Sequence, residues 1–251
     1  MAEVNHTDVV RERVLKKLIY GEYAPGHVFK LREMLEDPDF SGMSQTPVRE
    51  ALLQLVAKDI LTSQRGFSVR VPMPSVEHLT EVRAIRTQLE IMAALKTLGT
   101  WTPEKLAVLQ GIHKELIAAK AKGATSDILS ANVRFHFGLY GEGKSYLLNM
   151  ITTLWAITGP SVRYLYTDGV PSSSDRRHSH EDVMEGLKTG NPELVAKGIR
   201  DDLSSTGDRI LEVLRKTVSP EAQAIKQFEP IQLVRARERR IKSLNKKEDA
   251  A

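Results

Sequence analysis

The sequence contains no cysteine among its 251 residues. Disulfide bonds and thiolate metal sites are therefore excluded. No run of about 18 apolar residues occurs that could span a membrane, and the start "MAEVNHTDVV" lacks the charged-then-apolar order of a signal peptide. We therefore expect a cytoplasmic protein. A hydrophobic content of 41% is sufficient for the buried core of one or two domains.

The sequence mark of one common enzyme class is absent as well. The chain has no G-x-S-x-G segment, which argues against serine hydrolysis. A net charge of +4 and a pI near 9.2 are compatible with an acidic partner. Many ordinary proteins have similar values, so charge alone does not indicate a function.

Glycine and proline divide the first part of the chain into short elements. Val10, Val14 and Leu18 recur at helical spacing after Thr7, a possible helix cap. The turn "GEYAPGHVF" follows, and a short helix is predicted over 31–35 before "EDPDFSGM" ends it. We expect two helices joined by a turn.

A third helix is predicted to begin at "SQTP", with Ser44 or Gln45 as its cap and Pro47 in its first turn. Its predicted buried stripe consists of Val48, Ala51, Leu52 and Leu55. The segment "ILTSQRGFSVRV" then gives two strand-like runs around a tip with Arg65 and Gly66. Three helices and a hairpin are the order of a winged helix-turn-helix, whose third helix enters the DNA major groove.

Arg49 lies one turn into this third helix, on the side away from Val48 and Leu52. The start of a helix attracts phosphate, and an arginine there can donate two hydrogen bonds to guanine. The alternative is a solvated charge on an amphipathic helix. The hairpin directly behind the helix favours DNA binding.

After the linker "VPMPSVEH" only helical periodicity remains, from Ser75 to about Thr217. Six helices are predicted, two of which begin with a cap followed by proline, at Thr102 and at Asn191. We expect an antiparallel all-helical bundle. The predicted division is a DNA-binding domain over 1–71, a linker over 72–76, a helical domain over 77–217 and a basic tail over 218–251. The tail is expected either to contact DNA phosphates or to act as a solubilising segment.

One set of polar residues in the bundle has the spacing of a metal site. Asn132 and His136 are four positions apart and share a helix face. His180 lies ten residues before Gly190 and Asp202 twelve after it, so antiparallel helices rising about 1.5 Å per residue bring both to one height. The four side chains could bind a divalent ion. Alternatively, His136 is a core histidine and Asp202 a surface acid. The enzyme alternative is a metal-dependent hydrolase or lyase built on His136, His180 and Asp202.

Three segments of the first part, "GEYAPGHVFKLREML", "SQTPVREALLQLVAKDIL" and "RGFSV", resemble the DNA-binding domain of GntR-family bacterial transcription regulators, over about residues 10–71. The resemblance implies DNA contacts at Arg32, Thr46, Arg49 and Gly66. Gln45 stands where an arginine is usual, which implies a different base preference because glutamine favours adenine. The full predicted DNA-binding set is Arg32, Ser44, Gln45, Thr46, Arg49, Arg65 and Gly66.

The segments "NVRFH", "HSHEDVMEGLKTGNPELVAKGIRDDL" and "RTQLE" resemble the FCD ligand-binding domain of the FadR subfamily. The resemblance implies a helical bundle whose members often hold a divalent metal on one Asp and three His. Here Asn132 replaces the Asp and Asp202 the last His, so the oxygen-richer set shifts the expected ion toward Mn, Mg or labile Zn or Ni. Without a metal, Arg86 and Arg163 are candidate clamps for an anionic effector.

These patterns together predict a mainly α protein, with an N-terminal winged helix-turn-helix and a C-terminal antiparallel helical bundle. The expected function is transcriptional regulation, most often repression, by a homodimer on a pseudo-palindromic DNA operator. A small carboxylate effector bound in the helical domain is expected to modulate operator binding.

Overall fold

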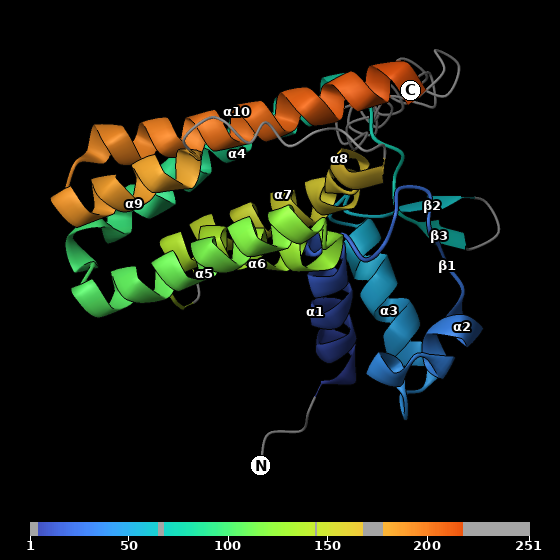
Figure 1. Cartoon of the computed structure of the whole chain (residues 1–251). Coiled ribbons are helices and arrows are strands. Elements are labelled where there is room, and N and C mark those ends of the chain that lie inside the picture. Colours follow the sequence, from blue (N-terminus) through green and yellow to red (C-terminus); the bar gives the residue numbers. More distant parts are fainter. Residues whose placement is uncertain (1–4, 65–67, 144, 168–177, 218–251) are drawn as a thin grey trace, which may run out of the picture. The chain divides into compact units, whose positions relative to one another are not determined.

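The structure is a computed structural model that describes residues 5–64, 68–143, 145–167 and 178–217 (Figure 1). The predicted wing residues Arg65 and Gly66 and the tail over 218–251 lie outside these ranges. The N-terminal elements are α1 (His6–Ile19), β1 (Val28–Phe29), α2 (Leu31–Glu36), η1 (Pro38–Phe40), α3 (Gln45–Val56), β2 (Thr62–Gln64) and β3 (Ser68–Arg70). The later elements are α4 (Val76–Thr97), η2 (Leu98–Thr100), α5 (Pro103–Lys122), α6 (Thr125–Leu139), α7 (Tyr146–Val162), α8 (Tyr164–Thr167), α9 (Ser179–Thr189) and α10 (Pro192–Thr217).

The first three helices pack around an apolar core. The predicted stripe of α3 is buried as expected, at Val48, Ala51, Leu52 and Leu55, and it faces α1. Ser44, one of the two predicted caps, is the N-cap of α3. The predicted cap at Thr7 is wrong, because α1 begins at His6 and its N-cap is Asn5, whose side chain accepts a hydrogen bond from the amide of Thr7.

The wing is a small antiparallel sheet with strand order β1-β3-β2. β2 and β3 are the predicted hairpin, and Ser63 pairs with Val69. β1 was not predicted, because two residues are too few to show a strand pattern, and Phe29 pairs with the other side of Val69. By pairing with β3, the short strand β1 links the start of the domain to its wing.

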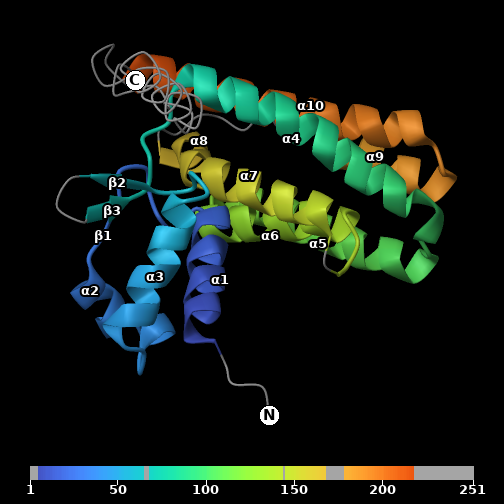
Figure 2. The same ribbon diagram turned by 180° about the vertical axis from the view of Figure 1, so that it is seen from behind.

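In the second part of the chain, all elements within the described residues are helices. α10 lies along α4 and α9, and α5 lies along α6, as both views show (Figures 1 and 2). Thr102 caps α5 and Asn191 caps the start of α10, which confirms both predicted helix starts. The short helix α8 is additional to the six predicted helices.

α1 also packs against α7 of the bundle. Gly159 makes this approach possible, because a Cβ atom there would collide with the carbonyl oxygens of Leu18 and Ile19. Residues up to Thr217 accordingly belong to one compact unit. In that described part of the chain, no helix is long and apolar enough to cross a membrane.

Candidate functional site

The first turn of α3 presents polar side chains outward. Ser44, Gln45, Thr46 and Arg49 are all exposed, whereas Val48 on the opposite side is fully buried. The apolar stripe therefore fixes the helix while its start remains accessible. This is the geometry that a groove-reading helix requires.

Arg32 lies on the neighbouring helix α2. Its side chain is 91% exposed and its Nε donates to Glu36 Oε1 at 3.2 Å. Such an exposed pair contributes little to stability, so the guanidinium can exchange Glu36 for a phosphate at small cost.

A second group of polar side chains is buried inside the bundle. Arg86 Nε donates to Glu90 Oε1 at 2.8 Å within α4, and the guanidinium lies 4.0 Å from the ring centre of Trp155. Glu90, which is fully buried, also accepts a hydrogen bond from the hydroxyl of Tyr140, the C-cap of α6. Burial raises the pKa of Glu90, but the charge of Arg86 and the bond to His136 outweigh it and lower the pKa.

His136 lies between two carboxylates. Its Nε2 is 3.1 Å from Asp202 Oδ2 and its Nδ1 is 3.4 Å from Glu90 Oε2. Burial lowers the pKa of His136, but the bonds and charges of Asp202 and Glu90 outweigh it and raise the pKa to about 9. In the absence of a bound ion the ring is therefore a cation at neutral pH. Arg86, Glu90, His136 and Asp202 then form two opposite-charge pairs, which is how buried charges are tolerated.

His180 completes this cluster from α9. Its side chain is 0% exposed, and its ring stacks on Phe135 with centres 3.6 Å apart. Nε2 lies 3.5 Å from Asp202 Oδ1, yet neither ring nitrogen has a hydrogen-bond partner among the residues described. Burial holds the pKa of His180 well below its usual value, so the ring is neutral and keeps a free lone pair.

The structure brings together three of the four residues predicted as metal ligands. One ligand atom from each of His136, His180 and Asp202 lies within 4.8 Å of the others. Asp202 is buried and accepts a hydrogen bond from Ser179 at 2.8 Å. Asn132 is half-buried on α6, one turn before His136.

The two predicted effector arginines have different surroundings. Arg86 belongs to the buried cluster and its Nη1 donates to Thr158 Oγ1 at 2.8 Å. Arg163 caps α7 and donates to the backbone carbonyls of Gly21 and Glu22, at 3.3 and 3.0 Å. The structure thus places Arg163 at the contact with α1 and not in the cluster.

Sequence reasoning did not select Glu90 and Tyr140. Each is four positions after a selected residue, Glu90 after Arg86 on α4 and Tyr140, the C-cap of α6, after His136. That spacing puts each pair on one helix face, and it was the available signal.

A cavity adjoins the cluster between α4, α7 and α10. Its lining includes Arg83, Arg86, Thr158, Ser161, Leu203 and Leu211. It combines apolar walls with two arginines and several hydroxyl groups, the usual character of a site for a small polar ligand.

An exposed helix start beside a wing, joined to a helical bundle with a polar interior, defines a winged-helix regulator with a ligand-sensing domain. Residues 6–71 match the family described as "Bacterial regulatory proteins, gntR family", and residues 81–205 match the FCD domain. The chain is 34% identical to the HTH-type transcriptional regulator McbR of Escherichia coli (strain K12), over 77% of this chain and 87% of that protein. It belongs to the GntR family of transcriptional regulators with an FCD domain.

Two further likenesses agree with this assignment. The solved structure of E. coli McbR/YncC matches with a TM-score of 0.72 and 30% identity, covering 86% of this chain and 100% of that one. A protein of Paenarthrobacter nicotinovorans named "Probable D-xylose utilization operon transcriptional repressor" is 25% identical over 74% of this chain and 80% of its own length. The predicted fold class is confirmed, and none of these proteins supports the hydrolase or lyase alternative.

Proposed function

We propose that this regulator reads a pseudo-palindromic operator as a homodimer and that a small organic acid bound in the bundle modulates the binding. The observation that carries the DNA part is the exposed polar start of α3 above a fully buried stripe. One such helix reads too few bases for specificity, so two copies on two half-sites are needed.

The proposed DNA contacts divide into two kinds. Arg49 and Gln45 are proposed to contact base edges, Arg49 at guanine and Gln45 at adenine. The remaining proposed contacts, to phosphates, are made by Arg32, Ser44, Thr46, Arg65 and Gly66. Selection of bound sequences from random duplex DNA tests this division. Two inverted half-sites are expected, and recovery of a single asymmetric site would contradict the dimer.

The effector is proposed to bind in the cavity beside Arg86. Arg86 donates through Nε to Glu90 and through Nη1 to Thr158. It can bind a carboxylate by giving up the bond to Thr158 while the bond to Glu90 remains. A bidentate guanidinium–carboxylate contact is stronger than the bond to a neutral hydroxyl that it replaces. Thr158 precedes Gly159, which touches α1, so a ligand that displaces Thr158 acts next to the DNA-binding domain.

The family often holds a divalent ion in this domain, and the residues here fit one. His136, His180 and Asp202 converge, and the unpartnered ring nitrogens of His180 are buried where an ion would satisfy one of them. Asn132 would be the fourth ligand. When bound, a Zn, Ni, Mn or Mg ion would offer open coordination positions to an effector carboxylate. His136 must first lose its ring proton.

The coupling is tested with two variants of the full chain. His136→Ala and His180→Ala are expected to bind operator like the unmodified protein but to lose both bound metal and the response to organic acids. A tenfold response corresponds to about 1.4 kcal/mol of coupling. Elemental analysis and operator titration with hydroxy and sugar acids provide the readouts. A full response from metal-free variants would contradict a metal role and leave Arg86 as the effector contact.

A further inference from the structure

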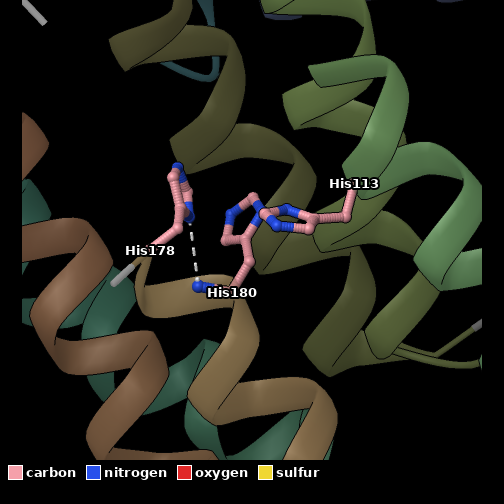
Figure 3. Close-up of side chains that lie close together, drawn as sticks. All are labelled: His113, His178 and His180. Atoms are coloured by element: carbon pink, nitrogen blue, oxygen red, sulfur yellow. Dashed lines mark hydrogen bonds between the residues drawn. The ribbon is translucent and has the colours of Figure 1, made fainter. Parts of the chain in front are cut away.

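A second group of histidines lies beside His180. His113 comes from α5, His178 is the N-cap of α9, and His180 follows two positions later, so the three rings converge (Figure 3). One ring nitrogen from each lies within 4.8 Å of the others. We propose that His113, His178 and His180 form an all-nitrogen site for a divalent transition metal, distinct from the set with His136 and Asp202. This site does not depend on an ion at that other set.

The buried nitrogens of this group carry the inference. His180 Nδ1, His180 Nε2 and His113 Nδ1 are buried, and the described part of the chain provides no hydrogen-bond partner for them. Leaving a buried polar atom unpaired is costly. A bound ion would satisfy one nitrogen on each of these two rings.

The rings are held close to the positions that an ion requires. The ring centres of His178 and His180 are 4.5 Å apart, and those of His113 and His178 are 5.2 Å apart. Tetrahedral coordination with metal–nitrogen bonds near 2.0–2.1 Å places ligand nitrogens about 3.3 Å apart. A small inward movement of His113 and His178 is sufficient, while Phe135 fixes the plane of His180.

Two existing contacts of His178 compete with an ion. Its Nδ1 accepts from the amide of His180 at 3.2 Å, and its Nε2 lies 2.7 Å from Lys120 Nζ. Binding through Nε2 moves the ring proton to Nδ1 and gives up the long cap bond. Lys120 must also turn away. Its side chain is half-buried near the end of α5, where it can rotate toward solvent.

The ligand type and the sharing of His180 set the properties of the site. Imidazole nitrogens favour Ni, Cu and Zn over Mn and Mg. A neutral imidazole has one lone pair for coordination. His180 can therefore bind an ion together with His113 and His178, or together with His136 and Asp202, but not both at once. The bundle is therefore expected to hold one ion of this type, at one of two positions.

Metal titration of the chelator-treated full chain tests the proposal. Ni²⁺ affinity is measured by competition with a chromophoric chelator, and Cu²⁺ electron paramagnetic resonance counts the coordinated nitrogens. His178→Asn is the central variant, because asparagine keeps the N-cap and removes the imidazole. We expect His178→Asn and His113→Gln to weaken Ni²⁺ binding at least about tenfold. His6→Gln, which removes an exposed histidine from α1, should change it less than about twofold.

The same measurements separate this site from the family-type position. Lys120→Met should strengthen Ni²⁺ binding, because it removes the competing ammonium. Three coordinated nitrogens in the unmodified protein and fewer in His178→Asn are expected. Binding that is unchanged in both His178→Asn and His113→Gln would assign the ion to the family-type position and overturn the proposal. Absence of Ni²⁺ binding by the unmodified protein would overturn it as well. Circular dichroism melting verifies that each variant is folded.

Discussion

The winged-helix segment and the helical bundle place their functional polar groups in opposite ways. At the start of α3, Thr46 and Arg49 are exposed above an apolar core, whereas in the bundle Glu90, His136 and Asp202 are buried. An exposed group keeps its hydration until DNA arrives. A buried charge needs a partner at all times, so the bundle is sensitive to any change in its polar set.

The largest effect of this difference is expected in a comparison of two matched ion pairs. Arg86–Glu90 and Arg32–Glu36 are both arginine–glutamate pairs at i and i+4, but their side chains are 8% and 0% exposed in the first and 91% and 66% in the second. Glu90→Gln should destabilise the protein by about 3–5 kcal/mol, because it leaves Arg86 without its counter-charge. Glu36→Gln should cost less than about 1 kcal/mol. Urea unfolding measures both, and equal effects would break the comparison.

Two helical glycines test the contact between the two regions. Gly159→Ala places a methyl group against the carbonyls of Leu18 and Ile19, and we expect a loss of about 1–3 kcal/mol together with weaker operator binding. Gly111→Ala is the control, since nothing lies within 4 Å of its Cβ position. That substitution should be neutral or stabilise by up to about 1 kcal/mol. A stable Gly159→Ala protein with normal operator affinity would show that the regions act independently.

Arg49 tests the exposed side of the comparison. Arg49→Ala should weaken binding to the selected operator by roughly 1–3 kcal/mol while leaving the free energy of unfolding nearly unchanged. Lys58→Ala, which removes an exposed charge beyond the end of α3, serves as the control in the same gel-shift titration. Equal losses in both variants would mean that Arg49 acts through overall charge and not as a base contact.

The smallest expected effect is a pH dependence of stability in the metal-free protein. The pKa of His136 is raised to about 9 by Glu90 and Asp202 despite burial, and Tyr140 and His180 also face the ring. A raised pKa stabilises the folded state most below the unfolded value near 6.5, and this stabilisation is lost as the pH rises through 9. Between pH 7.5 and 9 the loss should be on the order of 1 kcal/mol. Chemical unfolding of His136→Gln should lack this slope. The same slope in both proteins would assign it to another group.

The sequence was most informative where function depends on neighbouring residues. The start of α3, its buried stripe and the hairpin follow from local spacing alone, and His180 and Asp202 could be aligned by counting from one turn at Gly190. The spacing of Glu90 from Arg86 could have identified Glu90 as a site residue, but it was not selected. These features share a helix or adjoin a turn, so short-range rules are sufficient.

The features that escaped prediction depend on tertiary packing. His113 meets His178 across α5 and α9, and no sequence interval relates two helices that are not joined by a short turn. Arg163 has the right chemistry for an anion, yet its position at the end of α7 directs it to the carbonyls of Gly21 and Glu22. Only the packing of α1 on α7 determines whether Arg163 contacts an anion or these carbonyls.

Gly159 also limits how such regulators can be recombined. The backbones of α7 and α1 touch there without a side chain between them, so atomic radii fix the spacing of the two helices and no rotamer can adjust it. A chimaera that joins this bundle to another winged-helix segment must reproduce the helix end at Leu18 and Ile19. Grafting only the exposed residues of α3 avoids that requirement, and it is the simpler way to give this bundle a new operator.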